Sequence, residues 1–205
     1  MVRFSDVLSE GWNRCTRGSI ERRAERNRAA FDGYAETGHV HGQRRGAVAR
    51  LPYGKFTMDY NGCEVIACHN ALLTAGAEST LADTAAWFER RGTFLAGKWG
   101  SHVEAIPRFF RSRGLAPRTL YASSVKDPAA YDAFFAGGRA AVFSFWNSAK
   151  RLRDGVHTIA LAHGADGGLV IYNLYGTDAR ENTAFRSITE FVGKTGVLPI
   201  LLVVV

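Results

Sequence analysis

A short segment of the chain, residues 61–73, carries several reactive side chains within an otherwise apolar sequence. It reads NGCEVIACHNALL and contains two cysteines, a histidine and two asparagines. Most helical cysteines are small core residues. However, a helix N-terminus and a nearby imidazolium both favour the nucleophilic thiolate. Cys63 follows a glycine at the expected start of a helix that runs to about Ala75. We therefore predict that Cys63 is a nucleophile with a lowered pKa if a histidine lies beside it.

A histidine and an asparagine that could complete such a site lie in residues 154–176, DGVHTIALAHGADGGLVIYNLYG, which we predict to be a β-hairpin. If its loop is the five residues GADGG, His163 faces Leu169, and Asn173 becomes a diagonal neighbour of His157 on the same face. A two-residue turn inside this loop would put them on opposite faces. The apolar pattern of the strands is compatible with the five-residue loop. In that register His157 is the candidate base, and Asn173 would orient its ring, the third role of a catalytic triad.

These segments resemble papain-like cysteine peptidases, in the style of the peptidase domains of bacteriocin-processing (double-glycine leader) transporters and their free-standing relatives. The resemblance covers about residues 55–176 and includes WFERRGTFLAGKWGSHVEAIPRFFRSRGL for the middle helices and VFSFW for the strand before the histidine. It implies an α+β fold and cleavage of a peptide or isopeptide bond through a thioester. By position it implies Cys63 as nucleophile, His157 as general base and acid, and Asn173 as orienter.

Two positions near the cysteine differ from the family pattern. The family often places a glutamine about six residues before the cysteine to polarise the carbonyl, and Thr57 stands there. Asn61 is the nearest amide donor and our candidate oxyanion residue, although a turn or N-cap role fits its position equally well. Glu64 follows the cysteine where many relatives have glycine. It could shape the pocket or favour the helix start through the dipole.

The elements around these residues predict one α+β domain. Residues 1–50 are interpreted as a basic helical N-terminal extension packed on the same domain, and residues 51–205 as the papain-like cysteine hydrolase domain. Residues 47–62 are expected to run extended toward Cys63. Helices precede the strand-like segments AAVFSFW, VHTIALAH, LVIYNLYG and GVLPILLVVV, so N-terminal helices should pack on a C-terminal antiparallel β-sheet. Ser187 and Glu190 have the spacing of a capping box that opens a short helix before the last strand.

The composition limits the binding partners and the cellular compartment that we expect. The net charge is +7, but acids alternate with the bases in the N-terminal segment, as on a solvated helix face. No nucleic-acid-binding motif is found, so we expect no nucleic-acid role. The longest apolar stretch, VLPILLVVV, is too short to span a bilayer as a helix, and the N-terminus does not read as a secretion signal. Three cysteines, Cys15, Cys63 and Cys68, are few and odd in number, which favours the cytoplasm.

The expected partner is therefore a peptide or amide substrate, with no cofactor, metal, nucleic acid or membrane, and the oligomeric state stays open. A zinc site made of Cys63, Cys68, His69 and His157 lacks the paired ligand spacing of known sites. The leading hypothesis is a cysteine hydrolase. An acyl or amine transferase with the same triad, in natural-product biosynthesis or as a modifying toxin, is the alternative. A non-catalytic binding module on the same fold is the third possibility.

Overall fold

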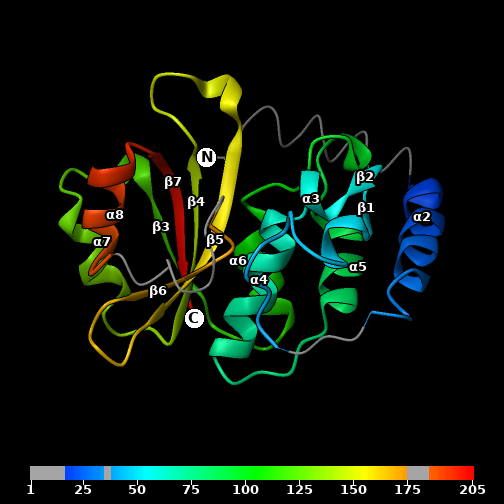
Figure 1. Cartoon of the computed structure of the whole chain (residues 1–205), viewed down its shortest axis with the longest axis horizontal. Helices are drawn as coiled ribbons and strands as arrows, with labels where there is room; N and C mark the ends of the chain where they lie inside the picture. Colours follow the sequence, from blue (N-terminus) through cyan, green and yellow to red (C-terminus); the bar gives the residue numbers. More distant parts are fainter. Residues whose placement is uncertain (1–16, 35–37, 175–184) are drawn as a thin grey trace.

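The computed structural model describes residues 17–34, 38–174 and 185–205, so Cys15 lies outside the described residues. A β-sheet lies between two groups of helices (Figure 1). The helices are α2 (Arg17–Ala29), α3 (Met58–Asn61), α4 (Cys63–Thr74), α5 (Leu81–Arg91), α6 (Ala105–Ser112), α7 (Ala129–Phe135) and α8 (Ile188–Thr195). Short 3-10 turns occur at Val48–Arg50, Leu95–Gly97, Ala122–Ser124 and Leu152–Asp154.

The sheet has five strands in the order β3-β7-β4-β5-β6. They are β3 (Arg118–Tyr121), β4 (Ala140–Trp146), β5 (Val156–His163), β6 (Leu169–Tyr172) and β7 (Leu198–Val204). All neighbouring pairs are antiparallel. The predicted α+β class, with N-terminal helices packed on an antiparallel sheet formed mainly by the C-terminal strands, is confirmed.

Strand alternation gives the sheet two apolar faces and the domain two cores. Val142, Ala160 and Val203 share one core with apolar residues of α4, α5 and α6. Phe143 and Ile159 point the other way, into a second core that contains residues of α7 and α8. Figure 1 shows these two helix groups on opposite sides of the sheet. Helix α4 is therefore buried between the sheet and the outer helices, which fixes the position of its first residue, Cys63.

The hairpin of β5 and β6 has the predicted five-residue loop. His163 pairs with Leu169, as expected, and the ladder continues to Ala160 opposite Tyr172. At Asn173 the backbone turns to φ 67°, so the chain leaves the sheet there in a left-handed conformation that asparagine tolerates better than most residues. Tyr175, predicted to lie opposite His157, is outside the described residues.

Residues 47–62 do not run extended as predicted. They form a 3-10 turn, the small hairpin of β1 (Pro52–Tyr53) and β2 (Phe56–Thr57), and then α3. The chain reverses at Gly54, which has φ 62°, and the N–H of Met58 returns to the carbonyl of Leu51 at 2.8 Å. The prediction was wrong because it placed Gly54 inside an extended segment, whereas this glycine forms a turn.

Helices α8 and α2 also have well-defined contacts. The predicted start of a helix at Ser187 is confirmed, because its hydroxyl accepts from the Glu190 N–H at 3.0 Å at the start of α8, while the Glu190 carboxylate accepts from the Arg186 N–H at 2.6 Å. Helix α2 packs on α5 through buried residues such as Ile20 and Ala24, and Asn27 donates to Glu89 at 2.7 Å. Among the described residues, none of the helices is both long and apolar enough to cross a membrane.

Candidate functional site

Gly62 places Cys63 at the first position of α4. It separates α3 from α4, and a side-chain carbon there would lie 2.6 Å from the carbonyl oxygen of Met58 and 2.9 Å from its sulfur. A larger residue would therefore separate the two helices. The glycine before the cysteine lets α3 stack closely on α4, whose N-terminal residue then meets strand β5.

The Cys63 thiol is buried between Glu64 and strand β5. Its side chain is 6% exposed, and Sγ donates a hydrogen bond to Oε2 of Glu64 at 3.0 Å. The backbone of Thr158, the residue after His157, also hydrogen-bonds to the sulfur. Burial, followed by the charge and the hydrogen bond of Glu64, raises the pKa of Cys63 well above the usual thiol value. The prediction of a lowered Cys63 pKa is therefore wrong, because it counted the helix N-terminus and omitted burial and the adjacent carboxylate.

The Glu64 carboxyl group is also buried, with 4% of the residue exposed. Burial raises its pKa from 4.5 to about 7, although the thiol and its own backbone N–H act in the opposite direction. From the sequence, Glu64 was expected only to shape the pocket or to favour the start of the helix. Its contact with the nucleophile candidate depends on the side-chain rotamer and burial, which the sequence does not specify.

His157 lies at the start of β5 and is fully buried. Its Nε2 is 2.6 Å from the main-chain oxygen of Asn173. A carbonyl oxygen can only accept, so Nε2 carries the proton and the lone pair of the neutral ring is on Nδ1. Burial lowers the pKa of His157 to about 4, opposed by the Asn173 carbonyl and assisted by the charge of Arg44. His157 is therefore a neutral imidazole at neutral pH.

The orientation of His157 follows its strand. The ring packs edge-on against Phe145, its cross-strand partner on β4, with centroids 5.9 Å apart. Alternation places His157 on the face of Ile159, whereas Thr158 lies on the α4 face. Cys63 thus lies beside Thr158, whereas the His157 side chain is on the opposite face of the sheet, and the thiol donates its hydrogen bond to Glu64.

Asn173 contacts His157 through its main chain, whereas its side chain binds Gln43. The Gln43 N–H donates to Oδ1 of Asn173 at 2.8 Å, and Nδ2 of Asn173 donates to Oε1 of Gln43 at 3.0 Å. Nε2 of Gln43 then donates to the carbonyl of Asp59 in α3, at 2.8 Å. Gln43 therefore joins the end of β6 to the helix before Cys63. Gln43 was not among the predicted site residues; the available signal was that it is the only glutamine in the sequence.

Asn61, the candidate oxyanion residue, is buried at the end of α3. Its Nδ2 donates to the carbonyl of Gly97 at 3.3 Å. The backbone of Gly97 packs closely against that of Gly54. A side-chain carbon added to Gly54 would lie only 2.6 Å from the Gly97 oxygen. One N–H of the Asn61 amide is thus held by the Gly97 carbonyl. In an oxyanion role, the second N–H would donate to the substrate oxygen.

The remaining polar residues of α4 have structural contacts. Cys68 is a fully buried core residue, as predicted. Nδ1 of His69 lies 3.1 Å from the Ser79 hydroxyl, and the Asn70 side chain bonds both main-chain groups of Val40 at 2.8 Å. Within the described ranges, no group of three histidine, cysteine, aspartate or glutamate residues is placed to hold a metal ion.

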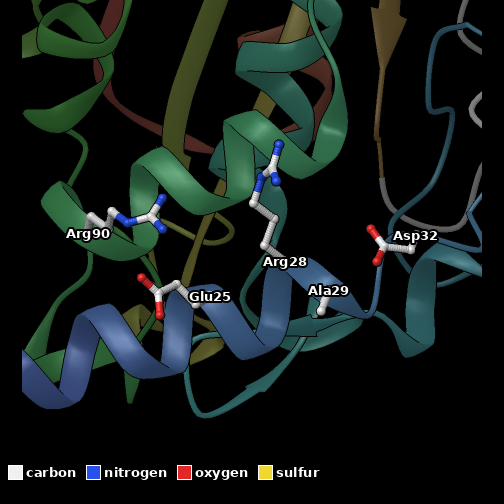
Figure 2. Close-up of a pocket in the computed structure, with 5 residues that line it drawn as sticks. All are labelled: Glu25, Arg28, Ala29, Asp32 and Arg90. Carbon is white, nitrogen blue, oxygen red and sulfur yellow. The ribbon is translucent and has the colours of Figure 1, made fainter.

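A surface hollow lies between α2 and α5 (Figure 2). Its volume is about 410 Å³, and Glu25, Arg28, Ala29, Asp32 and Arg90 line it. Arg28 is paired with Asp83 at 2.8 Å, and Arg90 with Glu21 at 2.7 Å. The hollow is an open groove between two helices, its arginines form ion pairs, and none of the candidate site residues line it.

Comparison with protein-family models, with curated proteins and with solved structures gives no match. The functional interpretation of this chain therefore rests on the contacts described above.

Proposed function

We propose that the chain is a papain-like cysteine hydrolase that cleaves a peptide or amide bond, with Cys63 as nucleophile. One observation carries the proposal: Cys63, the first residue of α4, lies against β5 at Thr158, directly after His157, whose Nε2 donates to the main-chain oxygen of Asn173. These residues come from three separate elements. Their order along the chain is the one that the resemblance to papain-like peptidases implies.

In the proposed reaction Cys63 attacks the carbonyl carbon and forms a thioester, which water then hydrolyses. His157 is neutral and carries its lone pair on Nδ1, the state in which an imidazole can act as a base. Asn173 fixes its tautomer through the main-chain carbonyl, and Gln43 fixes Asn173. Asn61 is the proposed donor to the carbonyl oxygen.

A peptide is the proposed substrate because large exposed aromatic side chains lie on segments that adjoin Cys63. Tyr60 in α3 is 66% exposed, and Trp99, two residues after Gly97, is 71% exposed. Phe56 packs against Tyr60 with ring centroids 4.9 Å apart. Exposed aromatics of this kind can pack against the side chains of an extended peptide. With two buried free cysteines, we also propose a reducing compartment, the cytoplasm.

The experiment is incubation of the protein with a synthetic peptide library, read by mass spectrometry. The wild-type protein should generate new peptide termini and a trappable acyl adduct on Cys63, and Cys63→Ala should give neither. Cys68→Ala is the matched control, since it removes a buried core thiol and should keep the activity. Addition of an amine such as glycine amide would divert the acyl group if the protein is a transferase. Identical behaviour of the wild type and Cys63→Ala would refute catalysis and favour a binding module.

A further inference from the structure

The hydrogen bond between Cys63 and Glu64 is a feature that the resemblance to papain-like enzymes does not account for. The sulfur lies 3.0 Å from the carboxylate oxygen, and both residues are buried. A general base must be within hydrogen-bonding reach of the proton that it takes, and it works best when its pKa is near the working pH. Glu64 meets the first condition at the thiol proton itself.

We propose that Glu64 accepts the thiol proton of Cys63 during nucleophilic attack, ahead of His157. This inference rests on the proposed hydrolase function. The Glu64 pKa of about 7 suits proton transfer at neutral pH, whereas the His157 pKa of about 4 gives the imidazole little driving force to take a proton from a thiol. Glu64 becomes a carboxylate again when the leaving nitrogen takes its proton, so it can also act as the base that activates water in the second half of the reaction.

The surroundings of Glu64 contain few other titratable groups. Tyr53 of β1 and Cys68 of α4 are the groups whose pKa values the charge of Glu64 raises, together with Cys63. Glu89 of α5 acts on Tyr53, and the neutral His157 lies at the start of β5. The raised pKa of Glu64 itself comes from burial rather than from a neighbouring charge. A titration of Glu64 can therefore be attributed to this carboxyl group.

The proposed steps conserve atoms and charge. As Sγ bonds to the carbonyl carbon, the S–H bond breaks, its proton moves to Oε2 of Glu64, and the C=O electron pair moves to the carbonyl oxygen. Collapse of this intermediate re-forms C=O and breaks the C–N bond, and the leaving nitrogen takes the proton from Glu64. Water then attacks the thioester with Glu64 as base. The acid is released, and the departing sulfur recovers a proton from Glu64.

The test separates this step from the rest of the reaction by following alkylation of Cys63 with iodoacetamide, read by peptide mapping from pH 5 to pH 9. In the wild type the rate should rise with a midpoint near pH 7, as Glu64 becomes a carboxylate. Glu64→Gln should lose that rise and react roughly a hundredfold more slowly at pH 7.5, the scale of general-base catalysis. Glu64→Asp, which keeps a carboxylate at a greater distance, should recover part of the rate.

The control is Glu89→Gln, which removes an equally buried carboxylate that binds Asn27 and the Gly54 N–H instead of the thiol. It should keep the wild-type pH profile. If Glu64→Gln retains the profile while His157→Ala abolishes it, the proton goes to His157. That result would overturn this inference and leave the hydrolase proposal standing. Absence of peptide cleavage in the wild type would instead count against the hydrolase proposal.

An infrared measurement reads the wild-type thiol directly and does not depend on a Glu64 variant. The S–H stretching band of Cys63, identified by its loss in Cys63→Ser, should shift as Glu64 titrates near pH 7, while the Cys68 band stays constant. A Cys63 band that is independent of pH between 5 and 8 would show that the thiol is not bonded to an ionisable carboxylate, and would refute the proposal.

Discussion

Replacement of Glu64 by glutamine should make the protein more stable than the wild type at neutral and alkaline pH. Folding raises the Glu64 pKa from 4.5 to about 7 by burying the carboxyl group. A raised carboxyl pKa means that the folded state is favoured while the group is protonated, below pH 4.5, and that this contribution is lost as the pH rises through 7. The difference between the two pKa values, at about 1.4 kcal/mol per pH unit, corresponds to about 3 kcal/mol. Glutamine carries no charge and avoids this loss.

The measurement is urea unfolding at several pH values between 4 and 8, followed by tryptophan fluorescence. The stability of Glu64→Gln relative to the wild type should increase by about 3 kcal/mol across this range, and comparison of the two proteins cancels the other titrating groups. Cys63→Ser is the control, since burial is the main cause of the raised pKa and the serine hydroxyl can still donate to the carboxylate. Parallel stability curves for Glu64→Gln and the wild type would refute the assignment of a buried, titrating carboxyl to this position.

Three other changes test the structure around the site. The lowered His157 pKa predicts a loss of about 3 kcal/mol of stability as the pH falls from 6.5 to about 4, and His157→Gln should lose correspondingly less in acid unfolding measurements. Gln43→Ala removes two side-chain hydrogen bonds and leaves Nδ2 of the buried Asn173 without its acceptor, so chemical denaturation should show a loss of about 2 kcal/mol or more; a cost near zero would mean that the contact does not hold β6. Gly62→Ala should cost about 1–3 kcal/mol in the same assay, because its methyl group would overlap the Met58 carbonyl, whereas Gly193→Ala in α8 meets nothing within 4 Å and should be tolerated.

The parts of the fold that the sequence predicted depend on local chemistry. The register of β5 and β6 follows from strict alternation on both sides of a short glycine-rich loop, because a shift by one residue would invert every side chain. The start of α8 follows from a serine and a glutamate three residues apart, and the start of α4 from a glycine before an apolar helical run. Each of these signals lies within a few residues of the element that it defines.

The parts that the sequence did not predict depend on distant contacts. Gln43 and Asn173 are 130 positions apart, and no periodicity connects them. Asn173 was predicted to orient the His157 ring; its main-chain carbonyl contacts the ring, at a left-handed backbone position, and its side-chain amide binds Gln43. This choice depends on where the loop before β1 packs. The diagonal relation within the hairpin was thus predictable, while the atom that makes the contact was not.

The ionisation of Cys63 shows how a local rule can be outweighed by packing. A helix N-terminus favours a negative charge by about 0.3–1 kcal/mol when exposed and by up to about 2 kcal/mol when partly buried. It acts on Glu64 as well as on Cys63, because both lie in the first turn of α4. The dipole therefore favours one negative charge on the pair without selecting its position. That position follows from intrinsic acidity, since a carboxyl group loses its proton more readily than a thiol. The carboxylate that results then raises the Cys63 pKa. Cys63 and Glu64 thus titrate as a unit with one proton between them, and the thiolate becomes accessible when that proton moves to Glu64 as sulfur bonds to its target.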